Sequence, residues 1–402
     1  MRANGHQAKA AIVGAGPAGL IAAIALAAAG IATTLIGRRS GSDHRTTALL
    51  AGSVTALETL GAWEACKALA APFRTMRIIE DTARLIRAPE VNFAASEIGL
   101  DAFGYNIENR YLVAALEARA NELPALTRIE DEARAIEIDA HGVTIKLKSG
   151  GEISAQLAIG ADGRRSLCRT AAGIDTDARS YPQTALTFNL RHAREHHDIS
   201  TEFHTESGPF TLVPLSGKRS SLVCVVEPDV AAQIGKLDGT ALAEELERRA
   251  HSILGRFEVE DGRGVFPLAI ATARQFGANR VALVGEAAHL IPPIGAQGLN
   301  LGLRDAATIG ELAVAAYRND GDIGAAELLA RYDAQRRADI KSRAFAIDLL
   351  NQTLLSDFLP LQGARGFGLY LIDRIGPLRR ALMREGVQPA ASQPRLMRGE
   401  LL

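Results

Sequence analysis

Two glycine-rich loops, far apart in the sequence, constrain the fold of this chain more than any other feature. The first carries Gly14, Gly16 and Gly19 and lies between an apolar run at 10–13 and a helix predicted over 18–29. This order of strand, glycine loop and helix is typical of a dinucleotide-binding β-α-β unit. The first glycine permits a tight turn, the second lets the backbone approach a diphosphate, and the third allows the helix to pack closely on the strand.

The second loop has a different design. It begins at Gly285, after an apolar run at 281–284, and leads through prolines and glycines into a helix near Leu299. A helix start presents unpaired N–H groups and a positive dipole end, which suit the pyrimidine edge of a reduced flavin because negative charge collects there. We expect the amides of Leu299 and Asn300 to face that edge and the Glu286 carboxylate to accept hydrogen bonds from ribityl hydroxyls. The predicted cofactor-binding residues of this loop are Gly285, Glu286, Pro293, Gly298, Leu299 and Asn300.

The end of the second strand, predicted over 32–36, departs from the dinucleotide-binding pattern. A ribose-binding Asp or Glu is expected about 20 residues after the glycine loop, but Gly37 occupies that place and Arg38 and Arg39 follow. Two arginines there could hold the 2′-phosphate of NADP, or Arg38 could lie along the adenine of FAD. We favour FAD because NADP would leave the later loops unexplained.

A further turn follows an apolar strand predicted over 155–159. Asp162 and Gly163 come just after it, at the carboxyl end of a strand, which is the edge where open α/β sheets bind ligands. An Asp-Gly pair is also a common turn, but beside the two glycine loops we interpret it as part of the FAD site. For His289, in the second loop, we expect a structural role rather than service as a base.

Composition and charge narrow the function classes. The net charge of −1 gives no reason to expect nucleic-acid binding, and three widely spaced cysteines argue against a disulfide framework or a zinc site. The stretch 17–36 is apolar enough for a membrane span, but it starts in a glycine turn and is broken by Gly30, so a buried helix and strand explain it better. We therefore expect a cytoplasmic protein with no metal site.

The basic tail differs from the rest of the chain. Residues 365–402 contain seven Arg against three acidic residues, interspersed with apolar side chains. Such a segment either packs on its own domain or contacts an anionic membrane, here at its inner face, or a biosynthetic complex.

Predicted elements change character along the chain. We expect helical segments over 46–69 and 107–122, and short β-rich runs from 181 to 267. The fold class is therefore α/β: a Rossmann-like FAD-binding domain with an inserted antiparallel β-sheet substrate domain and a helical C-terminal region. The FAD-binding domain is predicted at 1–72, 100–180 and 275–330, the substrate domain at 73–99 and 181–274, and the helical region at 331–402.

These motifs together resemble the group A flavoprotein aromatic hydroxylases, which share the para-hydroxybenzoate hydroxylase fold. Within that group the chain is most similar to the ubiquinone-biosynthesis hydroxylases, on 297–305 and on the tail. The segment that begins at Arg45 resembles their flavin-contacting arginine, and Asn109 begins their version of a helix that more often starts with Arg. Glu286 and Gly37 depart from the family, where most members have Asp and Glu, and both departures bear on FAD binding.

The resemblance implies a reaction as well as a cofactor. NAD(P)H or another electron donor would reduce FAD, and reduced flavin would trap O2 as a C4a-hydroperoxide that passes one oxygen atom to an aromatic ring. The substrate would be a prenylated phenol of ubiquinone biosynthesis, held between the inserted sheet and the flavin, with His204, Phe210 and Pro214 as candidates for the wall. The catalytic residues stay unknown, because the cofactor carries the difficult step.

Other functions stay open at this point. A hydroxylase of a small soluble aromatic acid is the chief enzymatic rival, and a flavin-dependent reductase is a weaker one. A halogenase is disfavoured because the single tryptophan, Trp63, cannot form the paired-tryptophan motif of those enzymes. A non-catalytic flavin-binding subunit of a biosynthetic complex is the rival from another class, kept open by Glu286 and Gly37.

Overall fold

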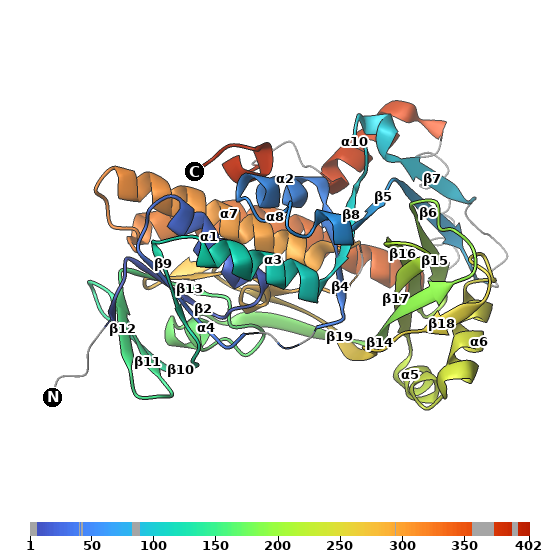
Figure 1. The fold of residues 1–402 in the computed structure, drawn as a ribbon, viewed down its shortest axis with the longest axis horizontal. Coiled ribbons are helices and arrows are strands. Elements are labelled where there is room, and N and C mark those ends of the chain that lie inside the picture. Colours follow the sequence, from blue (N-terminus) through green and yellow to red (C-terminus); the bar gives the residue numbers. More distant parts are fainter. Residues whose placement is uncertain are drawn as a thin grey trace.

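A six-stranded sheet forms the centre of the molecule in the computed structural model of this chain (Figure 1). Its order is β20-β21-β13-β2-β3-β9, and every pair of neighbours is parallel except β20 with β21. The carboxyl ends of β2, β13 and β21 therefore meet at one edge. The strands are β2 (Ala10–Val13), β3 (Thr33–Ile36), β9 (Leu126–Ile129), β13 (Leu157–Gly160), β20 (Gly277–Ala278) and β21 (Val281–Leu283). The structure describes residues 6–39, 41, 43–82, 89–293, 295–355, 374–387 and 393–402.

Helix α1 (Pro17–Ala28) is enclosed by this sheet and by helices α3 (Asn109–Asn121) and α7 (Gln297–Arg318). The residues from Gly19 to Ala27 are all buried, which explains why the helix is apolar all round rather than along one stripe. The stretch that resembles a membrane span is thus a helix of 12 residues followed by β3. In the described part of the chain, no helix combines the length and the apolar character that crossing a membrane requires.

A second sheet of nine strands lies beside the first (Figure 1). Its order is β22-β19-β14-β17-β16-β15-β6-β7, with β18 paired to β14, and only β15 with β6 is parallel among these pairs. Side chains alternate between its two faces: Phe203 and Phe210 pack under helices α5 and α6, whereas Glu202 and Thr211 line a cavity on the other face. These elements are α5 (Pro228–Gly235), α6 (Gly239–Arg249), β6 (Thr75–Glu80), β7 (Val91–Ala94), β14 (Thr176–His192), β15 (Ile199–Thr205), β16 (Gly208–Leu215), β17 (Arg219–Val226), β18 (Phe257–Val259), β19 (Gly264–Ala273) and β22 (His289–Leu290).

Two smaller sheets and several short helices complete the described fold. One sheet has the order β1-β12-β11-β10 and the other β4-β8-β5. Their strands are β1 (His6–Gln7), β12 (Glu152–Ala155), β11 (Val143–Leu147), β10 (Ala133–Ile138), β4 (Thr46–Leu50), β8 (Gly104–Glu108) and β5 (Ala71–Phe73). The remaining helices are α2 (Ala51–Thr59), α4 (Leu167–Ala171), α8 (Ala326–Leu355), α10 (Gly376–Val387) and the 3-10 turns Lys67–Leu69, Ala95–Ile98, Gly285–Ala287 and Arg395–Arg398. The predicted α/β fold, with its antiparallel sheet and helical C-terminal region, is confirmed.

The helix predicted over 46–69 is wrong at its beginning. Residues 46–50 form β4, which pairs antiparallel with β8 from Thr46 opposite Glu108 to Leu50 opposite Gly104. Helical spacing of apolar residues continues into α2, but pairing with a distant strand overrides it in the first five residues. The helix predicted from 107 likewise begins two residues later, because Ile107 and Glu108 belong to β8.

The C-terminal region folds back on the rest of the chain. Helix α10 packs through Arg379, Met383 and Val387, and Arg379 pairs with Glu97 (Nε to Oε2, 2.6 Å). Leu378 and Leu382 on α10, and Ile375 just before it, are exposed. The stretches 365–373 and 388–392 of the predicted amphipathic tail lie outside the described residues. After them, the chain end returns to pack against α2 (Figure 1).

Candidate functional site

The first glycine loop is packed as a dinucleotide site requires. A Cβ on Gly14 would lie 2.2 Å from the carbonyl oxygen of Ala161, and one on Gly19 would lie 1.9 Å from that of Gly14. Gly16, at the start of α1, has no such neighbour within 4 Å. No side chain caps the helix there, so its first N–H groups face open space. This cradle of backbone fits a diphosphate.

Helix α7 begins in the same uncapped way. Ala296 precedes it in a left-handed conformation (φ 55°), and no side chain caps the first turn. Gln297, Gly298 and Leu299 line the cavity, which places the unpaired amides of this turn at its wall. The Asn300 side chain, by contrast, accepts a hydrogen bond from the Leu50 amide (2.9 Å) and donates to the Ala48 carbonyl (2.8 Å). Its side-chain amide therefore ties α7 to β4, and Asn300 itself is buried and is not among the residues that line the cavity.

Asp162 organises the third loop. Its carboxylate accepts hydrogen bonds from Ser166 Oγ (2.5 Å), the Leu167 amide (2.7 Å) and the Cys168 amide (3.1 Å). It thereby fixes the start of α4 beside Ala161, the residue on which Gly14 packs. Gly163 follows with a positive φ of 76° and open space beside it. The Asp-Gly pair thus shapes the sheet edge next to the first glycine loop.

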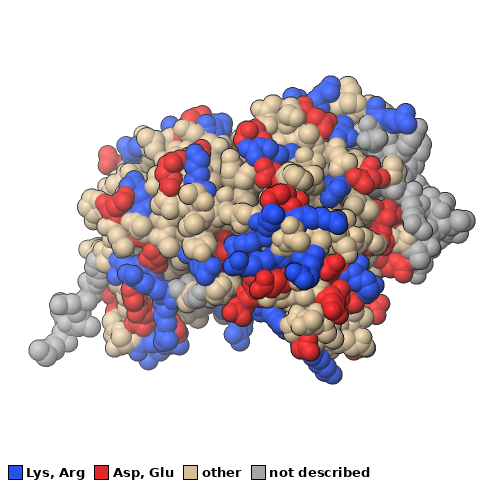
Figure 2. Space-filling view, turned by 45° about the vertical axis from the view of Figure 1, so that its right-hand side comes forward, with Lys and Arg blue, Asp and Glu red and all other residues tan. Residues whose placement is uncertain are grey.

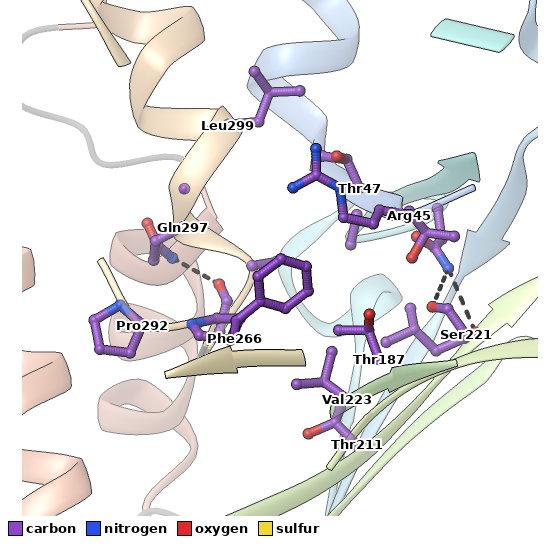
Figure 3. Close-up of a pocket in the computed structure, with 18 of the residues that line it drawn as sticks. Arg45, Thr47, Thr187, Thr211, Ser221, Val223, Phe266, Pro292, Gln297 and Leu299 are labelled. Carbon is purple, nitrogen blue, oxygen red and sulfur yellow. Dashed lines mark hydrogen bonds between the residues drawn. The ribbon is translucent and has the colours of Figure 1, made fainter. Parts of the chain in front are cut away.

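A cavity of about 350 Å³ lies between the loop that follows β21 and the polar face of the nine-stranded sheet. Figure 3 shows Phe266 and Pro292 on one side of it and Arg45 opposite, with Thr187 and Thr211 rising from the sheet. Other lining residues come from the predicted cofactor loop, from the nine-stranded sheet and from the small sheet β4-β8-β5: Thr47, Leu50, Phe73, Met76, Asn106, Glu202, Val213, Ser221, Val223, Glu286, Pro293 and Leu299.

Arg45 and Asn109 meet through a carboxylate that the sequence reading missed. Arg45 donates from Nε and Nη2 to Asp43 (2.9 and 2.7 Å), and Asn109 Nδ2 donates to the same carboxylate (3.0 Å). Burial works against the charge on Asp43, but these hydrogen bonds outweigh it and lower the pKa of Asp43. The Arg45 guanidinium lies 5.8 Å from the ring centre of Phe266, so a fixed cation borders the cavity. Asp43 lies in a loop without periodicity, which left no signal for it.

Arg38 and Glu286, two of the predicted cofactor-binding residues, form ion pairs with other loops. The Arg38 side chain is 72% exposed and pairs with Glu132 (2.8 Å), so it points away from the cavity lining. Glu286 lines the cavity and pairs with Arg164 (3.2 Å), on the loop next to Asp162. The longer side chain at 286 therefore reaches across the sheet edge to a second loop.

His289 lies in a buried cluster of charged residues, which suits the structural role predicted for it. It is buried, and its Nε2 lies 2.6 Å from Asp305 Oδ2, an oxygen that also accepts from the Gly285 amide (3.0 Å). The other oxygen, Oδ1, accepts from Arg336 Nε (2.7 Å). Burial alone would raise the pKa of Asp305, but the charges of His289 and Arg336 outweigh it and the pKa is lowered. This cluster fixes the turn at Gly285 from behind.

The three residues predicted to form the wall of the substrate cavity, His204, Phe210 and Pro214, do not line it. Phe210 packs against Phe203 in the core under α5 and α6 (ring centres 5.9 Å apart), on the face opposite to the cavity, and Pro214 is not among the lining residues. His204 acts one step removed: its Nε2 lies 2.8 Å from Oε1 of Glu202, which does line the cavity. Side chains alternate between the two faces of a sheet, so in β15 Phe203 must point away from the face of Glu202 and His204. This alternation could have predicted the arrangement from the sequence.

Glu202 is thus the charged group that sequence reasoning missed. Besides His204, its carboxylate accepts a hydrogen bond from Thr211 Oγ1 (3.2 Å). Burial opposes ionisation, but the hydrogen bonds and the charge of His204 outweigh it and lower the pKa of Glu202. The cavity therefore carries a negatively charged hydrogen-bond acceptor in its sheet wall.

Comparison with known proteins agrees with this geometry. The profile of a protein family described as an FAD binding domain matches residues 7–344. The chain is 35% identical to ubiquinone hydroxylase UbiL of Rhodospirillum rubrum, covering 96% of this chain and 92% of that protein. It is 32% identical to 3-demethoxyubiquinol 3-hydroxylase of Escherichia coli, covering 93% and 97%. In fold, it resembles the crystal structure of p-nitrophenol 4-monooxygenase from Pseudomonas putida (TM-score 0.78, 18% identity, covering 96% of this chain and 100% of that one).

Proposed function

Given that this chain belongs to the FAD-dependent aromatic-ring monooxygenases, in the branch of the ubiquinone-biosynthesis hydroxylases, we propose that it hydroxylates the ring of a polyprenyl phenol. FAD, when bound, supplies the activation of O2, and NAD(P)H or another donor supplies the electrons. The task of the protein is to bind the flavin, orient the ring and exclude water.

We propose that the FAD diphosphate rests on the start of α1 above Gly16, where open space meets unpaired N–H groups. The isoalloxazine ring would enter the cavity, where the first turn of α7 offers amides and Arg45 offers a cation. The residues assigned to FAD in this proposal are Gly14, Gly16, Gly19, Arg38, Arg45, Asn109, Asp162, Gly163, Gly285, Glu286, Pro293, Gly298, Leu299 and Asn300.

The cavity has a polar and an apolar part of its wall, and this division supports the proposed class of substrate. Glu202 and Thr211 make one part of its wall polar, whereas Phe73, Met76 and Val213 make another part apolar. A ring hydroxyl can donate a hydrogen bond to the Glu202 carboxylate, and a prenyl chain can pack on the apolar residues. This arrangement suits a molecule with a phenolic head and a hydrocarbon tail.

The same carboxylate weighs against the chief rival. A small aromatic acid would bring its own negative charge into the cavity that holds Glu202. Two like charges in a poorly solvated space repel each other, whereas a neutral phenol is attracted. A neutral, prenylated ring is therefore favoured over a soluble aromatic acid.

We further propose that α10 brings the enzyme to its insoluble substrate. Ile375, just before this helix, and Leu378 and Leu382 on it are exposed, at 43%, 40% and 47%, and Arg380 and Arg384 are exposed beside them. Apolar side chains next to arginines suit the inner, anionic face of a membrane. The enzyme would then act from the cytoplasm as a peripheral protein.

The test is direct. The purified protein is examined for a flavin spectrum and then incubated in air with NAD(P)H and a polyprenyl phenol, and the products are identified by mass spectrometry. A product heavier by one oxygen atom, with reductant oxidation that depends on the phenol, supports the proposal. Turnover of a soluble phenolic acid instead would discard the prenylated substrate, and bound flavin without turnover of any phenol would favour the non-catalytic subunit.

A further inference from the structure

Gly37 is packed so that an acidic side chain has no room at its position. A Cβ on Gly37 would lie 2.7 Å from the amide nitrogen of Ala15 and 2.9 Å from its Cβ, inside the first glycine loop. The residue that normally holds the adenosine ribose of a dinucleotide stands at this end of the second strand. If the chain binds FAD as proposed, the ribose needs a carboxylate from elsewhere.

The neighbouring strand brings one to the same edge. β3 and β9 are parallel, with Ile36 opposite Ile129, and the Gly37 amide continues the ladder by donating to the Ile129 carbonyl (3.1 Å). Glu130 therefore stands beside Gly37, one strand further out. Residues opposite each other in a parallel pair point to the same face of the sheet. Glu130 thus shares the face on which a side chain at 37 would meet the glycine loop, at a strand spacing of about 4.8 Å.

The charges around this edge are arranged in two pairs. Arg39 Nε lies 2.6 Å from Glu130 Oε1, and Arg38 Nε lies 2.8 Å from Glu132 Oε1. Glu132 also contacts Lys148, so it is paired with two cations, whereas Glu130 is paired with Arg39. Glu130 is 53% exposed, which leaves its carboxylate accessible to a ligand at the sheet edge.

We propose that Glu130 holds the hydroxyls of the adenosine ribose of FAD, in place of the acid that Gly37 excludes, and that Arg39 orients its carboxylate. A carboxylate accepts hydrogen bonds from a ribose diol, whereas it repels a 2′-phosphate. The same group therefore directs this site toward FAD and against NADP, although two arginines follow Gly37. The inference rests on the proposed FAD site and adds the residue that recognises its ribose.

The test compares Glu130→Gln with Glu132→Gln, a matched change two residues away. Binding of FAD to the apoprotein is measured by quenching of flavin fluorescence, and binding of FMN, which lacks the adenosine, is measured in parallel. Glu130→Gln should weaken FAD binding roughly tenfold, the usual effect of losing a hydrogen bond to a charged group, and leave FMN binding unchanged. Glu132→Gln should leave both unchanged.

Either of two results with the variant would overturn the inference. The first is FAD binding by Glu130→Gln equal to that of the wild type, and the second is an equal loss of FAD and FMN binding, which would indicate a general fault in folding. A wild-type protein that binds FMN and FAD equally well would overturn it too, because the adenosine would then contribute nothing. Failure of the wild type to hydroxylate a prenylated phenol, with these affinities as expected, would reject the proposed substrate and leave the role of Glu130 standing.

Discussion

At the scale of single residues, the Glu202 carboxylate is the feature with the clearest consequence for turnover. Replacing Glu202 with Gln keeps its size and removes the charge that a ring hydroxyl would meet. We expect kcat/KM for hydroxylation to fall by roughly 10- to 100-fold, the range for losing a hydrogen bond to a charged group. FAD affinity should not change, because Glu202 belongs to the sheet wall. Product formation and flavin fluorescence measure the two quantities separately.

A substrate change provides the control for that experiment. The O-methyl ether of the same phenol has no proton to donate, so the wild type and Glu202→Gln should turn it over at similar low rates. Ser200→Ala, which alters a neighbouring lining residue on the same strand, should retain most of the wild-type activity. If Glu202→Gln instead hydroxylated the phenol as fast as the wild type, the carboxylate would have no part in holding the ring.

At the scale of elements, an ion-pair network joins α7 to α8 behind the flavin loop. Asp305 on α7 is completely buried between His289 and Arg336, and Arg336 also pairs with Asp339 (2.7 Å). Asp305→Asn removes the charge and leaves the buried Arg336 guanidinium with Asp339 as an acidic partner but without Asp305. We expect a loss of about 3–5 kcal/mol in the free energy of unfolding, the range for breaking a buried pair. Urea unfolding followed by circular dichroism measures it.

An exposed pair gives the matched comparison for Asp305. Arg274 pairs with Asp177 at the surface (2.9 Å), and Arg274→Ala should lower the free energy of unfolding far less than Asp305→Asn does, because water screens an exposed ion pair. Equal effects of the two substitutions would show that the buried network does not stabilise the α7–α8 contact more than a surface pair does.

The same network predicts how stability depends on pH. The folded-state pKa values of Asp305 and Asp339 are lowered, because neighbouring cations outweigh the effect of burial. Carboxylates with lowered pKa values contribute stability that is fully present above their unfolded pKa, about 3.9, and is lost as the pH falls through the folded values. The melting temperature of the wild type should therefore drop steeply below about pH 4. The difference in melting temperature between the wild type and Asp305→Asn should shrink over the same pH range. A difference that stayed constant down to pH 2 would contradict this account.

Comparison of individual helices, strands and loops shows which parts of the structure could be predicted from the sequence. The glycine loops were predictable because each is local: strand, turn and helix follow within about twenty residues. The strand at Thr46–Leu50 was not, because its partner β8 lies more than fifty residues away and helical spacing runs through it. Glu202 was missed for a related reason: it lines the same cavity as the loop after β21, and that placement depends on how the nine-stranded sheet packs against this loop.

At the scale of the whole molecule, the three cysteines report on the integrity of the folded state. Cys66, Cys168 and Cys224 are all free and buried, and burial raises the pKa of Cys66 to about 11 and that of Cys224 to about 12. None should react with Ellman's reagent in the native protein at neutral pH, because the thiolate is the reactive form. Three thiols should react after denaturation. A thiol that reacts rapidly in the native protein would contradict the packing described here.

The surface of the molecule offers one further test. Figure 2 shows a band of basic side chains across the middle of one face, bordered above and below by acidic ones, and the net charge of the chain is −1. Binding to a membrane should therefore depend on the apolar face of α10 as well as on its arginines. The double substitution Leu378→Ser and Leu382→Ser should reduce co-sedimentation with phosphatidylglycerol vesicles at least several-fold. Leu69→Ser removes an equally exposed leucine elsewhere and should have no effect.

The strand order of the central sheet has a consequence for how the protein is made. β13 lies between β2 and β21, yet β2 ends at Val13 and β21 begins at Val281. At roughly 5–20 residues per second, a ribosome needs on the order of tens of seconds between those strands. The growing chain must keep an apolar strand edge from pairing wrongly throughout that interval. Assembly of the complete cofactor cradle must therefore wait for β21 and the loop after it, although the first glycine loop is made more than 260 residues earlier.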